Sequence, residues 1–465
     1  MSLFNSLANG ASALNAQGYA LQLTGKNLAN VNNAKYARER IVFGTGGMTQ
    51  TSLGTVTFDL DAQAVSQIRD AFLDQQVVRE GSTTAALSTE QSALQSAEAA
   101  LGETVSSSST TADTTSGAGL ASQLTGLFNS FSSLAASPAD TGVRQTLLQN
   151  AATLSDSLNQ TDSGLAQVQT DLNTRIQSDA GGINTLLTTI SDLNAQIARL
   201  ENGTPGSAVD LRDQRQSALE DLGAKISFDT SPATSGGQLQ ITSTDVNGNS
   251  VVLVDGANVV NTVAFDGTNL TAGGFALSLA SGSIKGALDA RDGTIQSFRA
   301  SLNALSRQVV TAVNTAYNPA GATGNFFAAA GTTAGTIALD PALTSRNLQA
   351  GAGVFAGDNT VALAVAGLAS KTFSTAAGDT IDGSLTQFLS GAVSAFGQAQ
   401  ANVNSRVENQ TSVENLVRSQ RDSVSGVDLN EETTNLMKYQ RAFQASSRFV
   451  NIVDNLLGTL VQLGT

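Results

Sequence analysis

The chain has 465 residues, enough for roughly two to four domains. It contains no cysteine, histidine or tryptophan, which removes disulfides, the commonest general base and the usual zinc ligands, so we expect no cofactor and no metal. A formal net charge of −14 opposes binding to nucleic acid, and no apolar run approaches the roughly 20 residues that membrane insertion requires. The N-terminus also lacks the basic and apolar regions of a cleavable signal peptide.

Apolar residues recur every seven positions near the N-terminus, which predicts a coiled-coil-like helix. The repeat consists of Leu7, Leu14, Leu21 and Leu28. Gly10, Gly18 and Gly25 lie inside the same segment, and each costs about 1 kcal/mol relative to alanine in a helix interior. Burying an apolar side chain returns roughly 1.5–3 kcal/mol. We therefore expect this helix to be weakly ordered alone and to order when a partner covers its seam.

Helical spacing continues through the interior of the chain. Its clearest seam consists of Ile176, Ile183, Ile190 and Ile197. Only the pair Gly181-Gly182 interrupts this seam, which we expect to pack within the chain. Further helical patterns begin near Leu120, Leu288 and Leu389. The serine- and threonine-rich run 106–116 is predicted to be a solvated loop.

Two stretches depart from helical spacing. Residues 227–283 alternate apolar and polar side chains and carry the turn dipeptides Asn247-Gly248, Asp255-Gly256 and Asp266-Gly267. This pattern predicts a small antiparallel β domain. Residues 319–383 are rich in glycine, alanine and threonine with weak periodicity, and there we expect a small module of mixed or β structure.

A second seven-residue repeat marks the C-terminus. It consists of Leu429, Leu436, Phe443, Val450 and Leu457, with Tyr439, Val453 and Leu460 on a neighbouring stripe. Asp428 can cap this helix, and Glu431 follows it as in a capping box. At about 1.5 Å per residue the helix is about 50 Å long. One short N-terminal helix cannot cover that length, which favours an interface with neighbouring subunits over packing inside the chain alone.

These patterns predict a mainly α fold with inserted β modules, in which paired terminal helices continue into a long helical bundle and the β modules are distal to the pair. The terminal helical domain comprises 1–60 and 425–465. The bundle comprises 61–226, 284–318 and 384–424. The antiparallel β domain is 227–283, and the small mixed or β module is 319–383.

Polar residues at both ends carry a family resemblance. The N-terminal set is Asn27, Asn30, Asn32, Tyr36 and Arg38, and the C-terminal set is Asp428, Glu431 and Glu432. Together they resemble the terminal signatures of flagellar rod, hook and hook-associated proteins, and the acidic pair is similar to the hook-associated protein 1 branch. The stretches 68–73 and 210–215 extend the resemblance inward. Asn33-Ala34-Lys35 departs from it, because the family usually has Thr-Pro-Gly there, which leaves the bend after the first helix undetermined.

The resemblance implies an extracellular structural subunit that is exported unfolded through the flagellar type III channel, without a cleavable signal peptide. Such a subunit forms a homo-oligomer at the distal end of the hook, between the hook protein and the second hook–filament junction protein. It serves there as the adaptor on which the filament is built. An export chaperone would bind the C-terminal helix before secretion.

Several residues also allow other interpretations. Asp428, Glu431 and Glu432 could form a metal or acid–base cluster, although capping of a helix start explains them more simply. Residues 245–249 faintly resemble a calcium loop but lack its closing glutamate, so a hairpin turn is favoured. An enzyme such as a glycan hydrolase needs two converging carboxylates, and the sequence marks out no such pair. We therefore expect no catalytic residues.

The C-terminal region is locally basic in an acidic chain. The basic residues are Arg418, Arg421, Lys438, Arg441 and Arg448. They could dock to acidic neighbours or form a solvated helix face, and the sequence does not distinguish the two.

Overall fold

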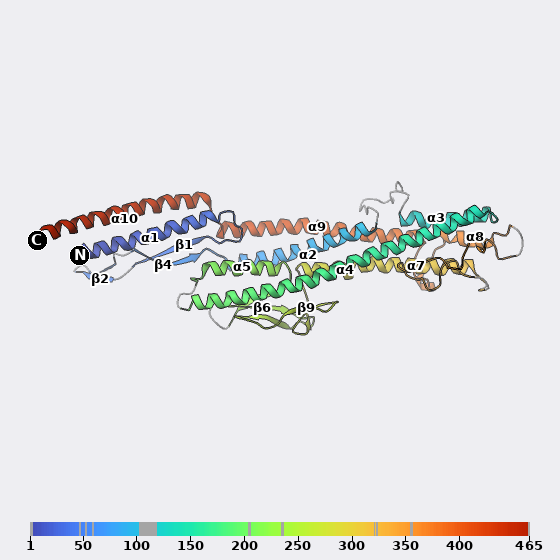
Figure 1. The fold of residues 1–465 in the computed structure, drawn as a ribbon, viewed down its shortest axis with the longest axis horizontal. Coiled ribbons are helices and arrows are strands. Elements are labelled where there is room, and N and C mark those ends of the chain that lie inside the picture. The colour runs from blue at the N-terminus through green and yellow to red at the C-terminus, as the bar shows by residue number, and fades with distance from the viewer. Residues whose placement is uncertain are drawn as a thin grey trace. The chain divides into compact units, whose positions relative to one another are not determined.

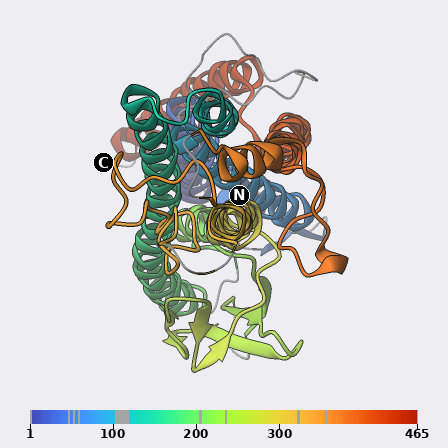
Figure 2. The same cartoon turned by 90° about the vertical axis from the view of Figure 1, so that its right-hand side faces the viewer.

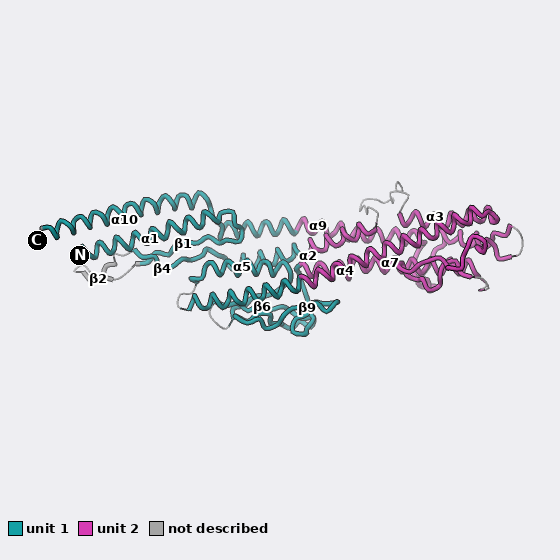
Figure 3. Tube along the Cα trace, viewed as in Figure 1, with its two compact units in different colours: residues 1–85, 179–282, 410–465 teal, residues 86–178, 283–409 magenta. Residues whose placement is uncertain are grey.

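The computed structural model divides the chain into two compact units, each assembled from separated stretches of sequence (Figure 1, Figure 3). Unit 1 contains Met1–Ala85, Asp179–Gly282 and Gln410–Thr465, and unit 2 contains Ala86–Ser178 and Ser283–Asn409. The described residues are 3–45, 48–51, 54–57, 60–101, 119–202, 206–233, 237–319, 321, 324–353 and 357–463. The predicted serine- and threonine-rich loop 106–116 lies outside them.

Helices dominate both units, and the mainly α class predicted from the sequence is confirmed. The α-helices are α1 Leu3–Ala29, α2 Ala71–Leu101, α3 Leu120–Ala136, α4 Thr141–Leu200, α5 Val209–Gly223, α6 Ser283–Asp289, α7 Gln296–Tyr317, α8 Thr360–Ala366, α9 Leu385–Ser425 and α10 Leu429–Leu463. Shorter turns are the π-helical η1 Ala290–Ile295 and the 3-10 helices η2 Gly367–Ser370 and η3 Thr375–Ala377. No described helix is both long enough and apolar enough to cross a membrane.

A β-hairpin follows α1 and lies along it (Figure 1). Strand β1 Glu39–Thr45 pairs antiparallel with β4 Leu60–Gln67, and β2 Met48–Thr51 pairs with β3 Gly54–Thr57. Ile41 stands opposite Val65, and the register shifts between Val42 and Phe43. The stretch 1–60, expected to form a helical domain, therefore holds a helix only as far as Ala29. Its later part carries β-branched residues that favour strands.

Residues 229–276 form two small antiparallel sheets. One has the strand order β5 Asp229–Pro232, β6 Leu239–Thr244, β7 Ser250–Asp255 and β8 Asn258–Val259, and the other has β11 Phe275–Ala276, β10 Leu270–Ala272 and β9 Val263–Phe265. Gly248, Gly256 and Gly267 adopt positive φ values of 86°, 59° and 97°, which their turn dipeptides anticipate. The Asp245 carboxylate accepts from the backbone N–H groups of Asn247 and Asn249 at 2.9 and 2.8 Å, so this loop is a hairpin turn.

These sheets lie beside α4 (Figure 2). Two asparagines on that helix hold them there. The fully buried amide of Asn194 donates to the carbonyls of Leu239 and Gly256 at 2.9 and 2.8 Å. Asn184 donates to the carbonyl of Val263 and accepts from its N–H, both at 2.8 Å. Strand ends, turns and sheet edges leave backbone groups unpaired, and the asparagine amides satisfy some of these groups.

The isoleucine seam of α4 is buried within the chain. Ile176, Ile183, Ile190 and Ile197 each have 0% exposure. The helix continues through Gly181-Gly182 without interruption. The spacing of these residues therefore identified both the helix and its buried face.

In unit 2, the stretch 319–383 packs on helices instead of forming a sheet. Its described part contains α8, η2, η3 and two isolated β-bridges, but no strand of two or more residues. Phe326 lies 5.0 Å from the ring of Phe131 on α3 and 5.5 Å from that of Tyr317 on α7. This aromatic cluster anchors the stretch on the bundle, which its weak periodicity did not reveal.

Candidate assembly interface

The terminal helices α1 and α10 pack along one another in opposite directions, so both chain ends lie at the same end of the pair (Figure 1). The side chains of Phe443 and Val450 point toward α1. A β-carbon built at Gly18 would lie 3.9 Å from Phe443, and one at Gly10 would lie 2.8 Å from Val450. The absence of a side chain at Gly10 therefore allows the two backbones to approach closely.

Most seam residues that the heptads single out are only partly covered. Those of intermediate exposure are Leu7, Leu14, Leu21, Leu28, Leu436, Tyr439, Phe443, Val450 and Leu457. Val453 is buried, whereas Leu429 and Leu460 are 51% and 54% exposed. The fully buried positions of α1 hold small or polar residues: Gly10, Ala16, Ala20, Thr24 and Asn27. The pairing inside the chain thus leaves much of the apolar seam accessible.

A second apolar stripe lies on the neighbouring face of α10. Phe449, Ile452, Leu456 and Leu460 follow one another at spacings of three, four and four residues, and they are between 47% and 59% exposed. This outer stripe shares one helix face. A row of large apolar side chains in water is typical of a surface that a partner covers. Of these residues only Leu460 was predicted from the sequence, because the seven-residue repeat favours the stripe that faces α1.

Where α1 ends and α10 begins, several of the motif residues meet in a polar cluster around the buried Asn27 and Glu432. The Asn27 amide donates to the carbonyl of Glu39 at 2.8 Å and to the carboxylate of Glu432 at 3.2 Å. Its oxygen accepts from the Tyr36 hydroxyl at 2.7 Å and from the Glu39 N–H at 3.1 Å. Asn27 therefore joins α1, β1 and α10 at a single point.

Arg38 completes this cluster by binding both members of the acidic pair. It donates to Glu431 and to Glu432, each at 2.8 Å. Glu432 is 2% exposed, so its charge is compensated within the chain. Hydrogen bonding to Glu431 raises the pKa of the Arg38 guanidinium. The acidic pair therefore ties α10 to the start of β1.

Asp428 caps α10 as the sequence suggested, because its carboxylate accepts from the Glu431 N–H at 2.8 Å. The backbone of Glu431 thus takes part in the cap, while its side chain pairs with Arg38. Within the described part of the chain, no group of three or more His, Cys, Asp or Glu residues is placed to hold a metal ion.

The bend after α1 follows from Asn30 and Asn33. Asn30 donates to the carbonyl of Lys26 at 3.0 Å and so closes the last turn of the helix. The Asn33 side chain accepts from the Lys35 N–H at 3.2 Å, and its carbonyl accepts from the Tyr36 N–H at 3.0 Å. Asn33 thereby supplies a turn in place of the usual Pro-Gly. Asn32 is exposed, and no described residue other than glycine has a positive φ.

A second set of ion pairs connects this cluster to α5. Lys26 contacts Glu39 at 2.8 Å and Asp210 at 2.5 Å. Burial raises the pKa of the Glu39 carboxyl, and the Lys26 ammonium opposes that shift. Arg69 bridges Asp74 and Asp213 at 2.7 and 2.6 Å. These contacts explain the matching stretches 68–73 and 210–215, whose roles the sequence left open.

The basic C-terminal residues divide into two groups. Arg421 is 5% exposed, and it pairs with Glu220 at 2.9 Å and donates to the carbonyl of Ala34 at 2.6 Å. Arg418 pairs with Glu414. Lys438, Arg441 and Arg448 are exposed. The first two arginines therefore stabilise unit 1 internally, and only the three residues on α10 remain accessible to acidic neighbours.

Comparison with known proteins identifies the chain by both its interior and its C-terminus. Residues 108–327 match the family model of the flagellar hook-associated protein FlgK helical domain, and residues 418–463 match that of the flagellar basal body rod FlgEFG protein C-terminal region. These matches define a structural protein of the bacterial flagellum. Within that class, the predicted resemblance to flagellar hook-associated protein 1 is confirmed, since the interior matches its helical domain and a relative of that name matches along nearly the whole chain.

Individual relatives differ in how much of this chain they match. The chain is 25% identical to flagellar hook-associated protein 1 of Bacillus subtilis, over 99% of this chain and 98% of that protein. It is 27% identical to the proteins of the same name from Salmonella typhimurium and Escherichia coli, over 49% and 53% of this chain but only 39% and 43% of theirs. The structure of the flagellar hook junction protein FlgK from Burkholderia pseudomallei aligns with a TM-score of 0.44 at 23% identity, covering 54% of this chain and 46% of that one.

Proposed function

We propose that this chain assembles at the distal end of the hook and serves as the adaptor on which the filament is built. The observation that carries the proposal is the outer stripe Phe449, Ile452, Leu456 and Leu460, which is apolar and largely exposed on α10. An exposed apolar stripe on a long helix suits a subunit that completes its packing against neighbours. The partly covered seam of α1 and α10 would join the same interface.

The partners in this proposal are copies of the same chain, the hook protein and the second hook–filament junction protein. An export chaperone would cover α10 before assembly, since the same apolar surface is exposed then. The route is flagellar type III export to the cell exterior. Lys438, Arg441 and Arg448 lie exposed on α10, and they would face acidic surfaces of the neighbours.

We infer no enzymatic role. Three carboxylates that are buried or partly buried are held in ion pairs: Glu39 with Lys26, Glu432 with Arg38, and Asp213 with Arg69. A general acid needs a carboxyl that exchanges its proton with substrate. Carboxylates held in this way suit a structural role better.

Electron microscopy of a strain lacking the gene, with flagellin assayed in the medium, tests the proposal. Complete hooks without filaments, together with flagellin outside the cells, are expected. Absent hooks would indicate a hook or rod function instead. Normal filaments in a strain without a paralogue would refute the junction role.

A further inference from the structure

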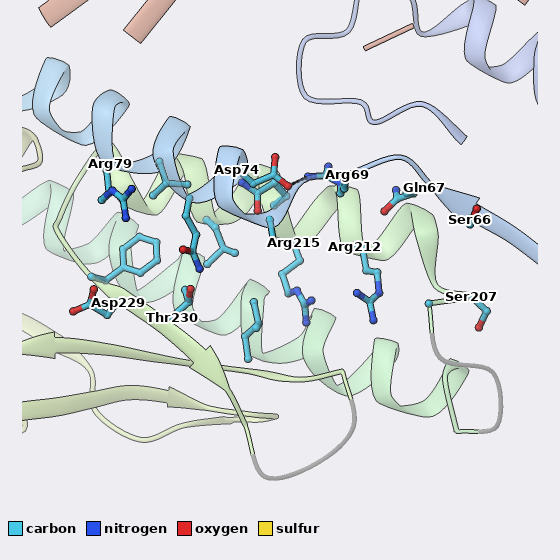
Figure 4. A pocket seen from close by; sticks show the side chains of 18 of the residues that line it. Ser66, Gln67, Arg69, Asp74, Arg79, Ser207, Arg212, Arg215, Asp229 and Thr230 are labelled. Atoms are coloured by element: carbon cyan, nitrogen blue, oxygen red, sulfur yellow. Dashed lines mark hydrogen bonds and ion pairs between the residues drawn. The ribbon is translucent and has the colours of Figure 1, made fainter. Parts of the chain in front are cut away.

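A cavity of about 620 Å³ lies in unit 1 among α2, α5, β4 and β5 (Figure 4). Pockets that bind small molecules typically have volumes of about 300–1,000 Å³. Its lining combines apolar side chains with four arginines. The apolar side chains include Val78, Leu219 and Phe228, and the arginines are Arg69, Arg79, Arg212 and Arg215.

Two of the four arginines are fully engaged inside the chain. Arg212 forms a two-point contact with Glu201, at 2.7 and 2.6 Å. Arg69 bridges Asp74 and Asp213. Arg79 is exposed to solvent. None of these three therefore presents a buried charge that lacks compensation.

Arg215 differs from the others. It is 6% exposed, and its Nη1 donates to the Asn194 side-chain oxygen and to the carbonyl of Gly237, both at 2.8 Å. Both acceptors are neutral, and Arg215 forms no ion pair with any residue that the structure describes. Burial lowers its pKa to about 10, so it remains charged at neutral pH. The Glu201 carboxylate acts favourably on Arg215 from beyond ion-pair distance, but it is bound to Arg212. A buried cation without an ion-pair partner of its own is costly, and an entering anion would offset that cost.

We propose that this cavity binds a carboxylate carried on a short apolar body, with the carboxylate on the guanidinium of Arg215. A guanidinium has five N–H donors, and the contacts with Asn194 and Gly237 involve only Nη1. The donors on Nε and Nη2 suit the two oxygens of a carboxylate. Figure 4 shows Arg215 and Arg212 projecting from α5 among the lining residues.

The lining also favours a ligand with one negative charge over a ligand with two. Asp74 and Asp229 belong to it, and they would repel a doubly charged phosphate more strongly than a carboxylate. Val78 and Leu219 provide contacts for an apolar body. The carboxylate could come from a free organic acid or from an acidic side chain of an adjoining protein. The site goes beyond the proposed assembly role and does not depend on it.

Isothermal titration of the purified full chain tests the proposal with two pairs of probes. One pair is butyrate and butyramide, and the other is a capped Leu-Glu-Val tripeptide and its glutamine counterpart. We expect at least one carboxylate probe to bind about tenfold more tightly than its neutral partner. Binding of butyrate would indicate a free acid, whereas binding of the peptide alone would indicate a protein side chain. Equal affinities within both pairs would overturn the proposal.

Variants then locate the site. Arg215→Gln should remove the preference for the carboxylate, but it also changes the contacts with Asn194 and Gly237. Thr230→Phe fills the cavity from β5 and leaves those contacts in place, so it should weaken binding about tenfold with an unchanged melting temperature. Arg175→Gln, at an exposed position on α4, is the control and should bind as the wild type does. Wild-type binding by both cavity variants would contradict the assignment.

Discussion

At the scale of single residues, two glycines of α1 have different surroundings. A β-carbon at Gly10 would lie 2.8 Å from Val450 and 3.0 Å from Phe449, whereas one at Gly25 would meet nothing within 4 Å. Alanine gains about 1 kcal/mol over glycine in a helix interior. We expect Gly25→Ala to stabilise the chain by up to that amount, and Gly10→Ala to lose the gain because Val450 must move. Thermal melting of both variants measures the difference, and equal shifts would contradict the close approach.

Glu431 and Glu432 provide a second matched pair, because both bind Arg38. The side chain of Glu432 is 3% exposed, and that of Glu431 is 58% exposed. Glu432→Ala leaves Arg38 without its buried partner and should cost about 3 kcal/mol. Glu431→Ala removes an exposed pair worth at most about 1 kcal/mol. Chemical denaturation compares the two, and similar losses would argue against a buried anchor at Glu432.

Glu201 should make stability depend on pH in the acid range. Hydrogen bonding from Arg212 lowers the pKa of Glu201 from 4.5 to about 2 in the folded chain. A carboxyl with a lowered folded pKa stabilises the fold above its unfolded pKa, and that contribution is lost as pH falls from about 4.5 toward 2. We expect Glu201→Gln to lower the melting temperature at pH 7 and to match the wild type near pH 2. If the melting temperatures of variant and wild type differed by the same amount from pH 7 to pH 2, protonation of Glu201 would not be linked to stability.

The residues of the polar cluster were only partly predictable. The family signature marked Asn27, Tyr36, Arg38 and Glu432, but not which of them meet. Asn27 and Glu432 are separated by 405 positions and touch at 3.2 Å. Local periodicity carries no information about such long-range contacts. The lack of an ion-pair partner for Arg215 was equally hidden, since its environment depends on α4 and on the turn at Gly237.

At the scale of elements, substitutions on the two stripes of α10 should have different effects, one on monomer stability and the other on incorporation into flagella. Val453 is 4% exposed and Ile452 is 59% exposed. Val453→Asp buries an unpaired carboxylate and should destabilise the monomer by about 3 kcal/mol. Ile452→Asp should change monomer stability by less than about 0.5 kcal/mol yet prevent incorporation into flagella.

Melting of the purified monomer and microscopy of complemented cells measure the two effects. The amount of secreted protein must be followed in parallel, because a chaperone on α10 would couple assembly to export. If Ile452→Asp is exported normally and supports filaments, the outer stripe is not an interface. Ser447→Asp, at a partly exposed position of α10 that belongs to neither stripe, serves as a charge control.

Elements with a long regular period were the most predictable. Seven-residue repeats identified α1, α4 and α10, because one seam stays on one face over many turns. The hairpin β1–β4 was missed, since its strands have only 7 and 8 residues and carry mixed side chains. The stretch 319–383 was expected to include β structure, and its Phe326 and Phe327 instead insert into a helical core.

At the scale of the whole molecule, each unit gathers segments that are distant in sequence. The terminal pair depends on contacts between the first and last helices, and most of its apolar seam is only partly covered. Stability is not uniform in such a chain, and weakly covered elements open first. This arrangement matches a subunit whose ends gain their full packing only on assembly.

Trypsin can test that expectation on matched sites. Lys438, Arg441 and Arg448 on α10 are exposed, as are Arg175 and Arg199 on α4. Ile183 and Ile190 of α4 are fully buried, whereas most of the α10 seam is only partly covered. In dilute monomer we expect cleavage at the three α10 sites well before either α4 site, because cleavage requires local unfolding. In isolated flagella the α10 sites should be protected, since neighbouring subunits would cover the outer stripe. Equal cleavage of α10 in monomer and flagella would mean that assembly leaves this surface open.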